Sequence, residues 1–315
     1  MPFTGAVDVD RVLAEFEAGA TIVLQALHYH WPPLAEFCRA LDRRLGHPVQ
    51  ANAYFTPRDS QGLSVHHDTH DVFVLQVAGT KRWLVYEPAL ALPLSDQRYA
   101  GDLEPPATPV QDVVLAPGDS LYLPRGWLHE ARTSHADSLH LTVGVNVYTW
   151  LDAFKAALAE CADELEYRRS VSPGSDVRAR LLALLADRLE PEDVARRMHE
   201  RLVRTRRPIR EGQLTQLREL DRLRLETQVE RRPTVIELLE ETKDHVVLSF
   251  EGKRVAFPRH AAEELSYVVG ASAPFRPADL SGQLDEAGKL TLVRRLVREG
   301  FLRIISAQEA DAPPP

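Results

Sequence analysis

Residues 62–88 read GLSVHHDTHDVFVLQVAGTKRWLVYEP, and this stretch decides the fold. Three histidines and two aspartates fall within six residues near its start, and the apolar run Val72–Val77 follows at once. A turn at Gly79–Thr80 then leads into a second apolar segment, residues 81–86. Apolar, β-branched runs on either side of a glycine turn predict a strand, a turn and a second strand. The ionisable cluster is therefore expected at one mouth of a β-structure.

The cluster contains the beginning of a metal site. His66 and Asp68 are two residues apart, and on a strand such residues point to the same face. One imidazole and one carboxylate are two thirds of the two-histidine, one-carboxylate set that leaves positions of an Fe(II) ion open. His129, in the segment LYLPRGWLHEA, is the best candidate for the third ligand. His140 alternates with apolar residues in SLHLTV and is expected to face the same interior.

Each of these residues also has an ordinary interpretation. The alternatives are a surface turn for the His66–Asp68 pair and a loop histidine for His129. Lys81, a further candidate that follows the Gly79–Thr80 turn, has the alternative of an exposed hairpin lysine. Solvated surfaces are usually rich in Lys and Glu rather than His, so metal coordination is favoured for the pair. The other two histidines of the cluster are expected to be bystanders.

Composition restricts the class of protein. The 315 residues are 44% hydrophobic and 27% charged, which is typical of a soluble globular protein. The sequence holds no apolar run of 18 residues and no visible secretory signal, so we expect no membrane association. The two cysteines form no metal motif, and this usage predicts a cytoplasmic location. The net charge of −8 disfavours non-specific nucleic-acid binding by the whole chain.

The first 150 residues are predicted to form a catalytic domain of the α+β class. Its expected helices cover residues 8–18 and 33–45, and a long loop covers 89–109. Short strands are expected at 21–27, 50–55, 72–78, 82–87, 111–116, 120–123 and 139–147. Many short strands separated by glycine and proline turns indicate a double-stranded β-helix, which is a jelly-roll barrel of the cupin kind.

The composition changes at Trp150. Residues 151–230 are rich in Ala, Leu, Arg and Glu at helical spacing, which predicts a helical region. Residues 231–306 contain a predicted hairpin around residues 251–253 and two predicted helices, and this order suggests a winged-helix-like unit. The tail 307–315 is rich in Ala, Asp and Pro and is expected to be disordered.

The motifs together resemble a known family. ANAYFTP, the quoted stretch, LYLPRGWLHEA and SLHLTVG occur here in the order and spacing of the JmjC-type ribosomal oxygenases. These are the cupin-4 family of Fe(II)- and 2-oxoglutarate-dependent protein hydroxylases. The resemblance is close over about residues 20–150 and extends to the rest of the chain in layout only. Members usually carry more chain before the first helix, so either the barrel is trimmed here or the sequence starts late.

The resemblance implies roles for individual residues. It assigns three residues to Fe(II): His66, Asp68 and His129. It assigns five residues to the pocket of the cosubstrate 2-oxoglutarate: Lys81, Asn52, Tyr54, Thr142 and His140. Among these, Lys81 would pair with the distal carboxylate of 2-oxoglutarate. Gly144 departs from the family, since some relatives carry a serine there.

The resemblance also implies an activity. We expect an oxygenase that uses Fe(II), 2-oxoglutarate and O2 to hydroxylate an amino-acid side chain of a protein or peptide, with a ribosomal protein as one candidate substrate. The helical region would form a homodimer, and direct DNA binding is disfavoured. The alternative is a non-catalytic metal-binding cupin that acts as a nucleic-acid or protein-interaction module. A metal-dependent isomerase or dioxygenase without 2-oxoglutarate is less favoured, because Lys81 would then lack a role.

Overall fold

The computed structural model describes residues 7–101, 107–171 and 177–305. These residues divide into two compact units. The first contains the chain up to Asp42 together with His47–Val147, and the second contains Arg43–Gly46 together with the chain from Tyr148 onward. The predicted disordered tail lies outside the described residues. None of the helices in the described ranges combines the length and the apolar character that crossing a bilayer requires.

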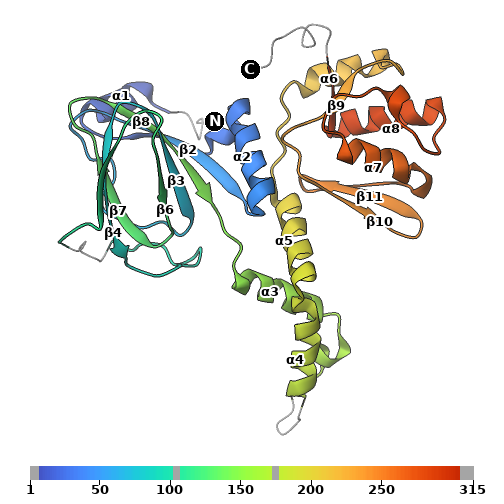
Figure 1. The fold of residues 1–315 in the computed structure, drawn as a ribbon, viewed down its shortest axis with the longest axis horizontal. Coiled ribbons are helices and arrows are strands. Elements are labelled where there is room, and N and C mark those ends of the chain that lie inside the picture. The colour runs from blue at the N-terminus through green and yellow to red at the C-terminus, as the bar shows by residue number, and fades with distance from the viewer. Residues whose placement is uncertain (1–6, 102–106, 172–176, 306–315) are drawn as a thin grey trace. The chain divides into compact units, whose positions relative to one another are not determined.

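The first unit is an antiparallel barrel of two facing sheets (Figure 1). Its described strands are β1 (Ile22–Leu24), β2 (Val49–Thr56), β3 (Asp71–Ala78), β4 (Lys81–Pro88), β5 (Gln111–Leu115), β6 (Ser120–Leu123), β7 (Trp127–Arg132) and β8 (Ser138–Val145). One sheet has the order β1-β2-β8-β3-β6 and the other the order β5-β4-β7. The expected jelly-roll barrel is thereby confirmed.

The interior between the two sheets follows from strand alternation. Val72 and Val74 of β3 meet Trp83 and Val85 of β4, and all four side chains are buried. The intervening residues of both strands point outward, as a period of two requires. The inner faces are therefore apolar over much of their length, so a polar side chain that points between the sheets is in apolar surroundings.

Two helices accompany this unit. Helix α1 (Val9–Glu17) begins where the Asp8 carboxylate accepts a hydrogen bond from the Arg11 backbone N–H. Helix α2 (Pro32–Leu45) packs Leu34 and Cys38 against the outer face of β2 and β8. Both predicted helices are thus present, within a residue or two at each end.

Strand β7 was not predicted. Its sequence, WLHEAR, alternates poorly, because His129 and the adjacent Glu130 are both buried. The Glu130 carboxylate accepts hydrogen bonds from the Tyr86 hydroxyl (2.8 Å) and from Gln61 Nε2 (2.7 Å). A charged residue is therefore buried by partners that are remote in sequence, and no local pattern indicates them.

The second unit begins with helices and ends with a mixed α/β domain. Its described helices are α3 (Trp150–Cys161), α4 (Arg178–Ala186), α5 (Pro191–Thr205), α6 (Gln213–Glu219), α7 (Ala262–Gly270) and α8 (Glu286–Glu299). Its described strands are β9 (Val229–Arg231), β10 (Glu237–Glu241), β11 (His245–Phe250), β12 (Lys253–Pro258) and β13 (Leu302–Ile304). The predicted hairpin is β11–β12, and β10 adds a third strand to it.

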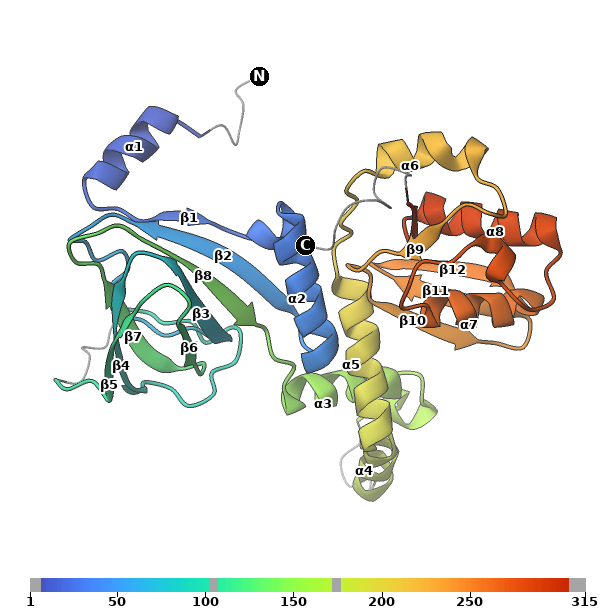
Figure 2. The same cartoon turned by 45° about the horizontal axis from the view of Figure 1, so that its top comes forward.

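The core of this second unit lies on one face of that three-stranded sheet, beside α7 and α8 (Figure 2). Val246, Leu248 and Phe250 of β11 contribute to it from the sheet. Gly300 ends α8 with a φ of 82°, a conformation in which glycine is favoured. Strand β13 follows α8 and pairs with β9. Along the chain, the hairpin β11–β12 comes before the helices α7 and α8.

A buried ion pair offers a test of the first unit. Arg39 Nη1 lies 2.8 Å from Asp42 Oδ2, and Asp42 Oδ1 accepts a 2.6 Å hydrogen bond from Val49 N. Asp42→Ala leaves a fully buried guanidinium without this carboxylate and should cost about 3–5 kcal/mol of unfolding free energy. Asp112→Ala, which removes the exposed partner of Arg82, should leave stability nearly unchanged. Urea unfolding followed by tryptophan fluorescence measures both, and equal midpoints would contradict the expectation.

Candidate metal centre

Backbone pairing brings two of the predicted ligands together. His66 lies just before β3 and forms an isolated antiparallel bridge with His129 of β7. The bridge has both hydrogen bonds, from His129 N to His66 O (2.8 Å) and from His66 N to His129 O (3.1 Å). Gly126 N donates to Asp68 O (2.9 Å), which fixes the third residue beside the start of β7. The loop formed by the 62 residues between the two histidines is therefore closed by main-chain contacts.

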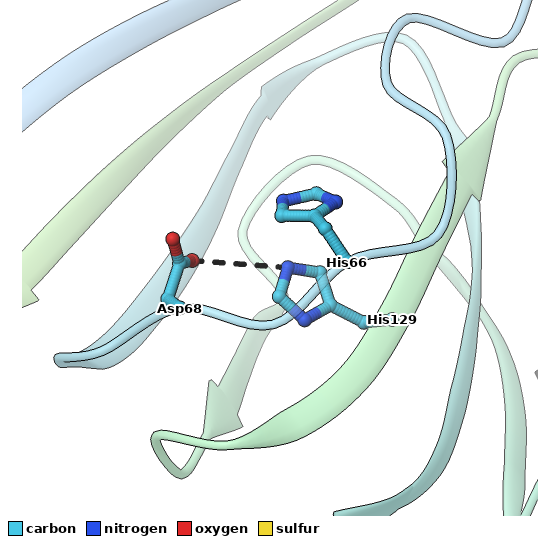
Figure 3. A group of neighbouring side chains, drawn as sticks. All are labelled: His66, Asp68 and His129. Atoms are coloured by element: carbon cyan, nitrogen blue, oxygen red, sulfur yellow. Dashed lines mark ion pairs between the residues drawn. The ribbon is translucent and has the colours of Figure 1, made fainter. Parts of the chain in front are cut away.

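The three side chains converge on one point (Figure 3). One ligand atom from each of His66, Asp68 and His129 lies within 4.8 Å of the other two. His129 Nε2 is 3.8 Å from Asp68 Oδ2, and the two imidazole centroids are 4.4 Å apart. The other histidines of the 66–70 cluster are outside this group. The structure thus brings together the set that the sequence predicted.

Hydrogen bonds orient both imidazoles. His66 Nδ1 lies 2.8 Å from Ser64 O, and His129 Nδ1 lies 3.0 Å from Trp127 O. A carbonyl oxygen only accepts, so each Nδ1 carries the proton and each Nε2 keeps a free lone pair. This is the arrangement that metal-binding histidines commonly show.

The protonation state of His129 also suits metal binding. The pKa of His129 is lowered to about 4, mainly by burial and also by the neighbouring His66, while Asp68 acts in the opposite direction. The imidazole is therefore neutral near pH 7, and only the neutral form binds a metal ion. Two imidazole nitrogens and one carboxylate oxygen are the donor set that suits Fe(II) with open positions. The residues present fit such an ion.

The segment that carries His66 is tied firmly to β7. Besides the Gln61–Glu130 hydrogen bond, Ser60 and Thr133 share three. Thr133 N donates to Ser60 O and Ser60 N donates to Thr133 Oγ1, both at 2.9 Å, and Thr133 Oγ1 donates to Ser60 O at 3.0 Å. These hydrogen bonds hold the residues that precede His66 in the sequence, and the main-chain bridge to His129 holds His66 itself. The ligand positions are thus set by structure outside the site.

Lys81 is buried in the pocket beside these ligands. Its side chain is only 4% exposed, so it is not the exposed hairpin lysine of the alternative interpretation. Its ammonium donates to Thr56 Oγ1 (2.8 Å), and Thr56 Oγ1 lies 2.9 Å from Thr21 Oγ1. No carboxylate among the described residues forms an ion pair with it. Burial lowers the pKa of Lys81 from 10.5 to about 8.

Three more of the predicted pocket residues line the same pocket. Tyr54 stacks on His140 at 5.0 Å between ring centroids, and Thr142 lies beside them on β8. Burial raises the pKa of Tyr54, with Asp68 acting in the same direction and the Thr142 and Asn52 side chains acting against it. Burial, with Lys81 nearby, lowers the pKa of His140 to about 3, so this imidazole is neutral.

Asn52 has a different position. It shares a face of β2 with Tyr54, as its spacing predicts, but it is not among the residues that line the pocket. Its Oδ1 accepts a 2.8 Å hydrogen bond from Ala26 N. Ala26 has a φ of 54°, which is unusual for an alanine, and this bond stabilises the turn there. Asn52 therefore contacts the pocket through Tyr54.

Sequence reasoning missed several residues of the pocket wall. Trp83, two residues after Lys81, and Thr21, on the approach to β1, both line it. Gly62 is also required, because a Cβ there would lie 2.0 Å from Thr21 Oγ1. The signal for Trp83 was its spacing from Lys81, since both share a face of β4.

The position at which the chain departs from the family is occupied by another side chain. A Cβ on Gly144 would lie 2.5 Å from His70 Cδ2 and 2.7 Å from His70 Nε2. The His70 imidazole therefore fills the space that a larger residue at 144 would need. His67 is also buried and packs edge-on against Tyr99.

Metal binding tests the centre directly. The wild-type protein should bind one Mn(II) per chain, and His66→Ala should weaken this by at least about 100-fold, since loss of even an outer contact typically costs 10- to 100-fold. His135→Ala is the matched control, because the His135 side chain is fully exposed. Isothermal titration calorimetry gives both affinities. Equal Mn(II) affinity of His66→Ala and wild type would refute the assignment.

Comparisons with known proteins agree with this geometry. A family model described as "JmjC domain" matches residues 26–153. Mouse Ribosomal oxygenase 2 is 31% identical over 269 residues, which cover 78% of this chain and 56% of that protein. Human Ribosomal oxygenase 1 is 35% identical over 168 residues, which cover 50% of this chain and 26% of that protein. The chain thus spans about half or less of the length of these relatives.

A third relative and a solved structure extend the comparison. A Drosophila persimilis protein named "Bifunctional lysine-specific demethylase and histidyl-hydroxylase NO66" is 39% identical over 133 residues, 42% of this chain and 19% of that protein. The Escherichia coli ycfD structure superimposes with a TM-score of 0.58 at 17% identity, over 90% of this chain and 78% of that one, which shows a shared fold. Residues 26–153 therefore match the JmjC domain, and the chain is similar in sequence to the ribosomal oxygenases.

Proposed function

We propose that this protein is an Fe(II)- and 2-oxoglutarate-dependent oxygenase that hydroxylates an amino-acid side chain of a protein or peptide. The observation that carries the proposal is a buried lysine that forms no ion pair with a carboxylate of the described residues, in the same pocket as a two-histidine, one-carboxylate set. A structure of the E. coli YcfD protein is described as a complex "with Cobalt and 2-oxoglutarate", which supports it. The names of the relatives support a ribosomal protein as the candidate substrate.

The proposed roles follow from the donors present. His66, Asp68 and His129 would hold the iron, which supplies, when bound, the redox centre at which O2 is activated with 2-oxoglutarate as co-reductant. Lys81 would bind the distal carboxylate of 2-oxoglutarate, and its hydrogen bond to Thr56 holds the ammonium in place. A charge buried without a counter-charge is costly, so an anionic ligand explains why the lysine is retained.

The remaining pocket residues would shape the cosubstrate site. Tyr54 and Thr142 offer hydroxyl groups, and the neutral His140 offers a ring nitrogen without a charge. Val72, Val74 and Leu123 supply an apolar wall that excludes water. In such surroundings a charge-assisted hydrogen bond is stronger than in water.

Lys81 separates the oxygenase from the non-catalytic cupin. Lys81→Ala should weaken 2-oxoglutarate binding to the Mn(II)-loaded protein by roughly 10- to 200-fold, because a bond to a charged group contributes roughly 1.5–3 kcal/mol. Mn(II) affinity should hardly change. The matched control is Arg82→Ala, because the neighbouring Arg82 side chain is exposed. Titration of 2-oxoglutarate measures the effect, and a wild-type protein that neither binds it nor releases succinate from it would favour the cupin.

The same titration has a predicted pH dependence. The pKa of Lys81 is lowered to about 8, so the ammonium is charged below pH 8 and increasingly neutral above it. Binding of an anion to the neutral form requires uptake of a proton. Wild-type affinity for 2-oxoglutarate should therefore fall by up to about tenfold per pH unit above pH 8. Lys81→Ala should show no such decline in this range.

For the rest of the chain we propose three parts and an assembly. Residues 1–150 would form the catalytic domain, 151–230 a helical dimerisation region, and 231–306 a winged-helix-like domain that does not bind DNA directly. Buried, unpaired Cys38 and Cys161 support a reducing, cytoplasmic location. The dimer is supported by α3, which buries small residues on one side and exposes Leu151, Phe154 and Leu158 on the other.

The exposed face of α3 makes the dimer testable. These three residues have helical spacing and are 43–50% exposed, so a two-fold interface would remove them from water. Phe154→Glu should convert a dimer into a monomer at micromolar concentration, because the interface would bury a charge. Lys243→Glu, an exposed change outside α3, should leave the dimer intact. Light scattering distinguishes these states, and a monomeric wild type would exclude this interface.

A further inference from the structure

The pocket wall contains a second buried hydrogen-bond donor besides the Lys81 ammonium. Trp83 is 5% exposed and lines the pocket, yet its indole Nε1 has no hydrogen-bond acceptor among the described residues. Buried N–H groups nearly always have an acceptor, and one left without it is unfavourable. The indole is held rigidly, because Trp83 packs in the barrel core with Val85 and Leu115.

We propose that Trp83 is a further cosubstrate-binding residue, whose indole N–H donates a hydrogen bond to the same carboxylate that Lys81 binds. The inference rests on the proposed function. Trp83 and Lys81 are two residues apart on β4, point to the same face and line one pocket. Residues at this spacing are about 6.6–6.8 Å apart along the strand, so both side chains reach an anion between them.

The chemistry of the two donors is complementary. Lys81 supplies the charge, and its ammonium already makes one hydrogen bond, to Thr56. The Trp83 indole supplies a neutral, directional donor that is always protonated. Nearby pocket residues such as Val72, Val74 and Leu123 are apolar and offer the indole no acceptor. A carboxylate has several acceptor sites and accepts from both donors at once.

A competing role for the indole N–H exists within the pocket. The Trp83 and His140 rings are 5.4 Å apart and nearly perpendicular, and His140 Nδ1 is itself buried without a partner. A small adjustment would join the two, or direct the N–H at the imidazole face. In that case the N–H would serve the packing of the pocket and would be insensitive to the ligand. The two roles therefore differ in what happens when 2-oxoglutarate binds.

The first experiment measures affinity. Trp83→Phe keeps an aromatic ring but removes the N–H, and it should weaken 2-oxoglutarate binding to Zn(II)-loaded protein by roughly tenfold or more. The same variant should bind 2-oxopentanoate, which lacks the distal carboxylate, as well as wild type does. Unchanged Zn(II) affinity and circular dichroism show that the fold and the metal centre are intact. An equal loss for both acids would mean that Trp83 acts through packing and would overturn the proposal.

The second experiment observes the N–H itself. The chain has four tryptophans, so the indole ¹H–¹⁵N spectrum has four signals, and Trp83→Phe identifies one of them. In diamagnetic Zn(II)-loaded protein, 2-oxoglutarate should move the Trp83 signal downfield, while the signal of the exposed Trp150 serves as the internal reference. A Trp83 signal that is unchanged at saturation would overturn this inference alone. A wild type that binds no 2-oxoglutarate would overturn the proposed function, and this inference with it.

Discussion

The candidate site depends on a single antiparallel bridge. His66 and His129 exchange both main-chain hydrogen bonds, so two segments far apart in the chain hold their imidazoles at a fixed separation. The Nδ1 hydrogen bonds to Ser64 and Trp127 then set which nitrogen of each ring is free. A candidate metal site built in this way takes the positions of its side chains from backbone pairing and from the hydrogen bonds that orient the two rings.

The barrel interior combines an apolar core with a small polar region, and this combination gives the site its character. Burial that stabilises the two sheets also removes water from Lys81, Trp83 and His140. In this low-polarity setting, a lysine becomes a weaker base, an imidazole stays neutral and an indole N–H lacks an acceptor. The same desolvation would strengthen each contact to an anionic ligand.

Much of the barrel was predictable, because its strands alternate and its turns contain glycine. The ligand set was also predictable, since two ligands share one short motif and the third lies in a matching segment. Strand β7 was missed because Glu130 is buried by Tyr86 and Gln61, which only the fold brings close. Two further features were missed for the same reason. They are the hydrogen bond from Ala26 N to Asn52 Oδ1 and the Trp83 indole N–H, which has no acceptor among the described residues. Local patterns report which face a residue occupies, not which partner it meets there.

The contact between His70 and Gly144 has a consequence for how this barrel can change during evolution. The imidazole occupies the volume that any side chain at 144 would enter, so the two positions share one space. A serine at 144 is compatible only with a rotated or smaller residue at 70, and substitutions at these sites will not be additive. Lineages that carry a side chain at 144 should therefore have replaced or reoriented the residue at 70, and the two positions should covary across homologues.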